Sequence, residues 1–163
     1  MSIMSILFTT SRKPSKRTRA FARDLCKCIP YAKFYSRGKA NIEKLVSIAK
    51  KEALDFIVMV LESKGNPSML RVIKLANTTW NYAYEIKIKL HKLRKEFTKE
   101  KFFVKEIKLE IKNKEIGNLF KELNILSYKE ADFILKEKKK VISLFYKNKE
   151  IGPRFEIYDI KKF

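Results

Sequence analysis

Glutamine is absent from this sequence of 163 residues, and glycine, proline, cysteine and histidine are rare, with four, four, two and one residues respectively. A lack of Gln beside abundant Lys and Glu is typical of thermophilic hosts. The two cysteines, Cys26 and Cys28, stand two positions apart on a predicted helix and point in different directions, so they neither bridge each other nor clamp a metal. A reducing compartment fits this cysteine content, and we predict a cytoplasmic protein.

Long hydrophobic runs are also lacking. The longest uninterrupted apolar run is Phe56 to Leu61, which is far shorter than a membrane span. The N-terminal stretch MSIMSILF is apolar but has no basic segment before it and no small-residue cleavage site. We therefore interpret it as a first strand rather than a signal peptide, and we expect no membrane partner.

Several enzyme classes lack their usual residues. The basic turn near residue 12 contains no glycine, whereas loops that cradle nucleotide phosphates need several so that the backbone can approach the ligand. The single histidine, His91, lies in a Lys-rich segment and is interpreted as an ordinary surface or turn residue. The acids are scattered among lysines, and no pattern selects two carboxylates for metal-assisted cleavage, although two can meet in space. We expect no catalytic residue, no metal site and no cofactor.

Positive charge is what the sequence has in excess. Its 38 Lys and Arg residues against 18 Asp and Glu give a formal net charge of +20. Such an excess repels itself unless an anionic partner neutralises it, and nucleic acid is the obvious partner. Hydrophobic residues make up 45% of the chain, enough to fill a core, so a disordered chain is excluded.

The arginines are clustered near the N-terminus. Residues 1 to 50 hold 12 basic and 2 acidic groups, which is a net charge of +10 and half of the total excess. Five of the eight arginines lie within this stretch, namely Arg12, Arg17, Arg19, Arg23 and Arg37. Guanidinium groups bind phosphate through two parallel hydrogen bonds, which ammonium groups do not. A uniformly solvated lysine surface does not explain such a local cluster.

Hydrophobic patterning predicts alternating strands and helices in the first third of the chain. A strand buried on both faces is expected from Ile3 to Thr9. Pro14 and Ser15 then open a helix that runs to about Cys28. A short strand at 33–36 follows, and Asn41 caps a second helix.

A hairpin and a second series of strands complete the pattern. DFIVMVLE (55–62) is the clearest buried strand, SKGNPS supplies turn residues, and MLRVIKLA (69–76) returns as the hairpin partner. The later elements predicted are Lys-rich strands at 80–90 and 102–111, a helix at 116–123, and strands at 132–137, 141–147 and 154–160.

A short internal echo indicates two related halves. KEALDFIV (51–58) and KEADFIL (129–135) each lead from a helical region into a strand and then a hairpin. No linker rich in Gly, Ser or Pro separates the halves. We expect one α/β domain at 1–163, with halves of about 1–78 and 79–163 that share a core.

The helix predicted at 15–28 has two unlike faces. At about 100° per residue, four basic residues fall on one stripe, Lys16, Arg19, Arg23 and Lys27, which we call the basic stripe. The opposite side holds Phe21, Leu25, Cys28 and Ile29. A solvated polar face is the alternative interpretation, but such faces usually mix the two signs, and here the one acid, Asp24, lies at the flank.

The start of this helix is a predicted phosphate site. The preceding turn contains Arg12 and Lys13, and the N-terminal amides of the helix, with their partial positive charge, point to where these side chains sit.

Aromatic residues beside cations are candidates for stacking on unpaired bases. They are Tyr31, Phe34, Tyr35, Trp80, Tyr82 and Tyr84. Core filling by half of them is an equally good interpretation. Strand alternation predicts that Trp80, Tyr82 and Tyr84 share one face, without deciding which face is buried.

Three separated motifs occur in this order along the chain: TTSRKPSKRTRAF (9–21) with SRGK (36–39), ESKGNPS (62–68), and GPRFEI (152–157). Together they resemble the Brix domain family of ribosome-biogenesis proteins. In order and extent they resemble the short archaeal members and the family member of the eukaryotic small-subunit processome. The GPT element that eukaryotic members carry after the middle hairpin is absent, and LANTTWNY (75–82) stands in its place.

The resemblance implies two similar α/β halves, each like the anticodon-binding domain of class II aminoacyl-tRNA synthetases, sharing mixed sheets packed with helices. It also implies binding of precursor ribosomal RNA without catalysis. The basic residues that match the family motif are Arg12, Lys13, Lys16, Arg17, Arg19, Arg37 and Lys39. With Arg23 and Lys27 of the basic stripe they form the predicted RNA-binding set.

The sequence therefore leaves three hypotheses in order of preference. The first is a non-enzymatic factor that binds precursor ribosomal RNA and assists its processing and subunit assembly, with ribosome-assembly proteins as further partners. The second is a structural RNA- or DNA-binding protein, ribosomal or chromatin-like, with no assembly role. The third is a metal-dependent nuclease.

Overall fold

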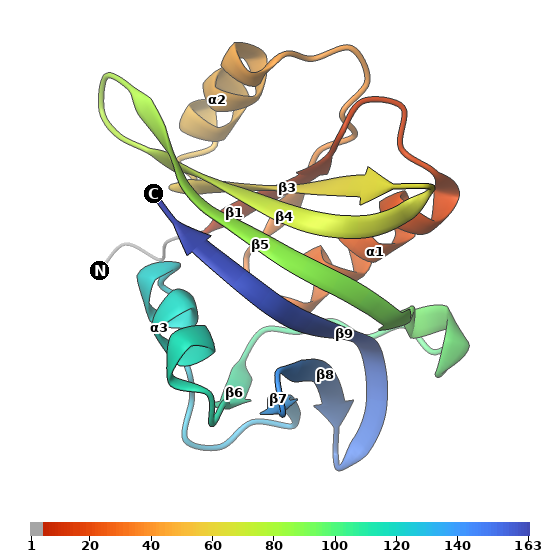
Figure 1. The fold of residues 1–163 in the computed structure, drawn as a ribbon. Helices are drawn as coiled ribbons and strands as arrows, with labels where there is room; N and C mark the ends of the chain where they lie inside the picture. The colour runs from red at the N-terminus through yellow and green to blue at the C-terminus, as the bar shows by residue number, and fades with distance from the viewer. Residues whose placement is uncertain (1–4) are drawn as a thin grey trace.

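The computed structural model describes residues 5–163, which form a mixed α/β fold with one large sheet and few helices (Figure 1). In chain order the elements are β1 (Ile6–Thr10), α1 (Lys16–Cys28), β2 (Lys33–Phe34), α2 (Ile42–Lys51), β3 (Phe56–Ser63), β4 (Asn66–Leu75), β5 (Trp80–Lys92), the 3-10 turn η1 (Arg94–Glu96), β6 (Ile107–Glu110), α3 (Lys114–Glu122), β7 (Phe133–Lys138), β8 (Val141–Tyr146) and β9 (Lys149–Lys162).

The nine strands follow the order β2-β1-β3-β4-β5-β9-β8-β7-β6. In the first series β1 and β3 pair in parallel, and β3, β4 and β5 follow as antiparallel neighbours. In the second series β6 and β7 pair in parallel, and β7, β8 and β9 follow as antiparallel neighbours. The two series meet in the middle of the sheet, where the long strands β5 and β9 pair antiparallel (Figure 1).

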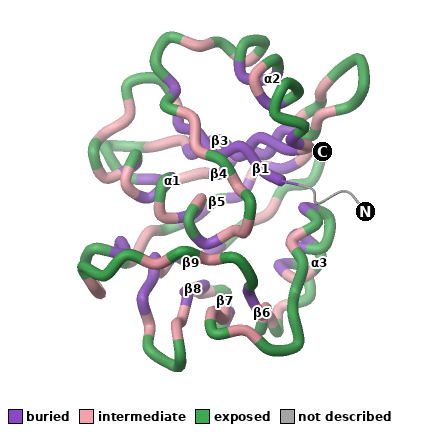
Figure 2. The backbone as a smooth tube through the Cα atoms, turned by 180° about the vertical axis from the view of Figure 1, so that it is seen from behind, coloured by how far each residue is buried: buried purple, intermediate pink, exposed green. Residues whose placement is uncertain are grey.

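The helices cover both faces of the sheet unequally. α1 and α3 contribute to one large hydrophobic cluster, which also contains side chains of strands from both series. α2 packs on the other face through Leu45, Val46 and Ala49, in a smaller cluster. β1 is buried on both faces, as predicted, because Phe8 belongs to the large cluster and Leu7 to the small one. Figure 2 shows this burial in the central strands, with exposed turns around them.

Most elements lie where the sequence predicts them, with two differences. Ile3 and Met4 of the predicted first strand lie outside the described residues. The predicted strand at 102–111 is wrong over its first half, since only Ile107–Glu110 forms β6. The preceding segment is irregular and packs Phe102 edge-on against Phe133 at 5.9 Å between ring centroids.

The prediction that Trp80, Tyr82 and Tyr84 share one face is also wrong. Val72 of β4 pairs with Tyr84, whereas the next residue of β4 pairs with Tyr82, so Ala83 is an extra residue in β5. Such a bulge shifts the alternation of side chains by one position. Tyr84 consequently enters the large cluster, and Trp80 and Tyr82 pack with the small one.

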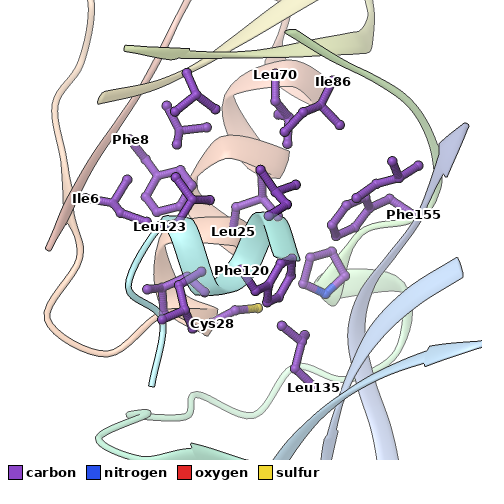
Figure 3. A pocket seen from close by; sticks show the side chains of 17 residues that line it. Ile6, Phe8, Leu25, Cys28, Leu70, Ile86, Phe120, Leu123, Leu135 and Phe155 are labelled. Carbon is purple, nitrogen blue, oxygen red and sulfur yellow. The ribbon is translucent and has the colours of Figure 1, made fainter. Parts of the chain in front are cut away.

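A cavity of about 60 Å³ lies in the large cluster between α1, α3 and the sheet (Figure 3). Leu25, Phe120 and Phe155 point into it from α1, α3 and β9. Its lining is apolar apart from the thiol of Cys28, and burial raises the pKa of that thiol to about 12. The cavity offers no polar group to orient a nucleotide, so we regard it as a feature of the packing between the two helices.

Candidate nucleic-acid interface

α1 presents the two faces that the sequence predicts. Its N-cap is Ser15, whose side chain accepts a hydrogen bond from the backbone N–H of Thr18 at 3.1 Å. Phe21 is fully buried and Leu25 is 7% exposed, so one face is firmly held in the core. The four side chains of the basic stripe, Lys16, Arg19, Arg23 and Lys27, are all exposed.

The one acidic residue of α1 is turned away from the basic stripe. Asp24 accepts a hydrogen bond from the backbone N–H of Arg94 at 2.9 Å. Burial raises the pKa of Asp24, while the hydrogen bond and the charge of Arg94 act in the opposite direction. Because this carboxylate is engaged inside the protein, the exposed face of α1 carries positive charge only.

A carboxylate of the protein occupies the start of α1, where a bound phosphate was expected. Glu62, near the tip of the β3–β4 hairpin, accepts hydrogen bonds from the backbone N–H of Ser15 at 3.0 Å and from the hydroxyl of Thr18 at 2.6 Å. These two bonds, that from Thr18 foremost, lower the pKa of Glu62. The negative charge satisfies the helix end and opposes a second anion. The carboxylate of Glu62 therefore competes with the phosphate predicted at these amides, and that site stays a prediction.

Arg37 has a structural position. It is 9% exposed, and its guanidinium donates to the backbone oxygen of Ala40 at 2.6 Å and of Thr10 at 3.1 Å. Burial, and then the charge of nearby Arg12, lower the pKa of Arg37. Arg37 thus ties the SRGK segment, which also contains the exposed Lys39, to the end of β1.

The remaining residues of the predicted RNA-binding set differ in their exposure and in their contacts with other side chains. Arg12 and Lys13 are exposed in the turn before α1. Arg17 is half-buried and lies 3.8 Å from the carboxylate of Glu96. Arg23 is exposed, but its guanidinium stacks over the ring of Phe34 at 4.7 Å from the ring centroid. The structure therefore gathers the exposed cations on the turn before α1 and along its outer face.

Sequence reasoning missed Arg94, which links the two series of strands. Its guanidinium donates twice to the backbone oxygen of Gly152 in β9, at 3.1 and 2.9 Å, and it is 7% exposed. The GPRFEI motif was a signal for this contact, since Gly152 opens it. Arg94 therefore connects α1 with β9, because its backbone N–H binds Asp24 and its guanidinium binds Gly152.

Of the predicted stacking residues, Tyr31 is the most exposed, at 58%. Phe34 and Tyr35 are half-buried, and Trp80, Tyr82 and Tyr84 pack as described above. The sequence did not select Phe103, which is 79% exposed.

Within 5–163 no group of three or more His, Cys, Asp or Glu side chains is placed to hold a metal ion. His91 lies 3.5 Å from the carboxylate of Glu156 at the protein surface. Across the same residues, none of the helices has the length and apolar character needed to cross a membrane.

No family model matches the chain. Curated relatives do match. A probable Brix domain-containing ribosomal biogenesis protein of Methanococcus maripaludis is 28% identical over 96% of this chain and 97% of its own length. One of the same description from Pyrococcus horikoshii is 35% identical over 77 residues, which are 47% of this chain and only 34% of that protein. The predicted relationship to archaeal Brix domain proteins is confirmed by these homologues.

Solved structures agree on the fold. The crystal structure of a probable ribosomal biogenesis protein from Aeropyrum pernix has a TM-score of 0.74 at 23% identity, over 94% of this chain and 95% of that chain. The crystal structure of an archaeal Imp4-like protein has a TM-score of 0.76 at 19% identity, over 97% and 99% of the two chains. At these identities the likeness concerns the fold alone.

Proposed function

We propose, from the premise that this chain is a homologue of the archaeal Brix domain-containing ribosomal biogenesis proteins, that it is a non-enzymatic factor which binds precursor ribosomal RNA and assists its processing and assembly into subunits. The names of the relatives state ribosomal biogenesis. We infer the binding of RNA from the positive charge that this chain exposes.

The observation that carries the proposal is the single sign of charge on the outer face of α1. Four exposed cations lie along this helix, and its one carboxylate is engaged with Arg94 inside the protein. Phosphates spaced along an RNA backbone neutralise such a row and release their counterions, which gives sequence-independent affinity. Arg12 and Lys13, in the turn before the helix, extend the row beyond its start, and Lys39 is a further exposed cation.

We also propose that the two series of strands are related halves of one domain, each resembling the anticodon-binding domain of class II aminoacyl-tRNA synthetases. The equivalent places of KEALDFIV and KEADFIL, at the starts of β3 and β7, support the relationship. In the strand order, β5 has the same place in the first series as β9 has in the second. This correspondence favours a boundary between the two halves that lies between β5 and β6 over a boundary near residue 78.

Crosslinking in the native host, followed by sequencing of the bound RNA, tests the proposed function. We expect reads concentrated on precursor ribosomal RNA, and the protein on precursor particles but not on mature ribosomes. Reads spread over messenger RNA or genomic DNA would refute the assembly role and favour a general nucleic-acid-binding protein.

We expect the protein to bind a structured ribosomal RNA more tightly than duplex DNA of equal length, because RNA offers unpaired bases and 2′-hydroxyl groups. We also expect purified protein to leave RNA intact in the presence of divalent metal ions. Cleavage that persists through purification and disappears when a carboxylate of this chain is replaced would instead support a nuclease. We place the protein in the cytoplasm as part of the proposal.

A further inference from the structure

Beyond the basic stripe, a groove of about 240 Å³ lies between the C-terminal end of α1 and the irregular segment before β6. Ile29, Ala32 and Val104 are half-buried and supply apolar lining. Tyr31 and Phe103, which also line it, are residues with 58% and 79% exposure. Together with this lining the two aromatic residues form one contiguous apolar patch, and such patches are typical of binding sites.

Cations flank the same groove. Lys27 and Lys105 are exposed and line it, and the ammonium of Lys105 lies 5.8 Å from the centroid of the Phe103 ring. Among the described residues that line the groove, none is acidic. Lys27 is also the last member of the basic stripe, so the groove continues the row of cations along α1.

We propose that this groove binds an unpaired base of the RNA, stacked on Phe103 and Tyr31, with Lys27 and Lys105 neutralising the adjoining phosphates. A nucleotide has an aromatic plane next to a negative charge, which matches rings flanked by ammonium groups. An RNA strand that follows the basic stripe reaches the groove at Lys27. The inference rests on the proposed function, because it names the part of the RNA that the site selects.

The test uses an RNA hairpin with a 2-aminopurine in its unpaired loop, and a fully paired RNA duplex of equal length as the reference ligand. Stacking quenches the fluorescence of 2-aminopurine, so the wild-type protein is expected to quench it. Phe103→Ala and Tyr31→Ala are each expected to remove most of the quenching and to weaken hairpin binding by about 5- to 100-fold. Duplex affinity and the salt dependence should remain as in the wild type, because neither ring carries charge.

Tyr158→Ala is the matched control, since Tyr158 is an aromatic residue of β9 with 52% exposure that does not line the groove. It should quench and bind like the wild type. If Phe103→Ala and Tyr31→Ala keep full quenching and full hairpin affinity, the groove inference is overturned while the proposed function stands. If the wild-type protein binds neither RNA, the proposed function itself fails.

Discussion

The two helices on the same face of the sheet, α1 and α3, begin in the same way. The side chains of their N-cap residues, Ser15 and Asn113, each accept a hydrogen bond from the backbone N–H three positions on. The loop before each helix is also bound by a carboxylate from the next strand of the series, Glu62 of β3 for α1 and Glu137 of β7 for α3. The two series of strands therefore repeat one way of holding a helix.

Their outer faces differ in charge. α1 exposes the four cations of the basic stripe, whereas the charged side chains that α3 exposes have mixed signs, namely Lys114, Glu115, Lys121 and Glu122. A face with mixed signs has little attraction for a polyanion. The comparison shows that the same framework presents different charges at its two helices, and the RNA binding that we propose depends on the residues presented at α1.

The largest effect is expected where the two helices are equivalent, on their buried faces. Leu25 of α1 and Leu119 of α3 are 7% and 3% exposed. Leu25→Asp and Leu119→Asp should each unfold the protein, because an unpaired buried carboxylate costs several kcal/mol, comparable to the stability of a small domain. Circular dichroism during heating measures this. A cooperative transition near that of the wild type in either variant would show that its helix is not essential to the core.

A smaller effect distinguishes the bulges of the two central strands. In β9 the irregular pairing places Gly152 at φ +69°, and a Cβ atom there would lie 2.6 Å from ring carbons of Phe97. Gly152→Ala should therefore lower the free energy of unfolding by about 2 to 4 kcal/mol. In β5 the bulge holds Ala83, and Ala83→Gly should cost only about 0.5 to 1 kcal/mol. Equal losses in urea unfolding would contradict this difference.

The two carboxylates that hold the helices should respond differently to amidation. Glu137 accepts from Lys112 and Asn113 through one oxygen and from Lys140 through the other, each at 2.8 Å. Glu137→Gln places an NH₂ group against a backbone donor and should cost about 2 kcal/mol. Glu62 uses one oxygen for both of its hydrogen bonds, so Glu62→Gln should cost less than about 1 kcal/mol. Urea unfolding measures the loss of unfolding free energy in the two variants. A larger loss for Glu62→Gln than for Glu137→Gln would contradict this prediction.

Acid should destabilise the protein through the same groups. Burial raises the pKa of Glu137, but the backbone hydrogen bonds, first that from Asn113, outweigh it and lower the pKa; the pKa of Glu62 is lowered as well. Because these two pKa values are lower in the folded protein, the unfolded chain takes up protons at a higher pH than the folded protein does. The stabilisation is present above the ordinary pKa of 4.5 and is lost below it. Unfolding free energies from about pH 6 to about pH 3 should fall less steeply in Glu137→Gln than in the wild type. Parallel curves of unfolding free energy against pH for the two proteins would contradict the role assigned to Glu137.

Much of the framework followed from local pattern. Ser15 and Asn41 cap α1 and α2 as expected, and the turn at SKGNPS joins β3 to β4. Capping and turn formation depend on residues within a few positions, so a single sequence contains their cause. The two faces of α1 were predictable for the same reason, because helical spacing alone separates Leu25 from Arg19.

What could not be predicted depends on distant partners. Glu62 lies 47 positions from Ser15, and Arg94 lies 58 positions from Gly152, so neither contact leaves a local pattern. The extra residue Ala83 shifts the alternation of side chains in β5 by one position, and an alternating sequence pattern does not predict where a bulge occurs. Arg37 resembled the other arginines in sequence, and only the fold shows that it binds backbone oxygens.

The most direct test of the central claim measures how RNA affinity depends on salt in two matched charge-reversal variants. Arg19→Glu with Arg23→Glu alters α1, and Lys114→Glu with Lys121→Glu makes the same charge change on α3. Exposed substitutions usually change stability by about 0.5 kcal/mol or less, and loss of the contact between Arg23 and Phe34 adds about 0.5 to 1 kcal/mol, so both variants should stay folded. The α1 variant should lose at least about tenfold in affinity for structured ribosomal RNA, and its log–log salt slope should fall by about 1.5 to 2. The α3 variant should keep the slope of the wild type. Equal slopes in all three proteins would contradict the account, because the basic stripe would then be only a solvated surface.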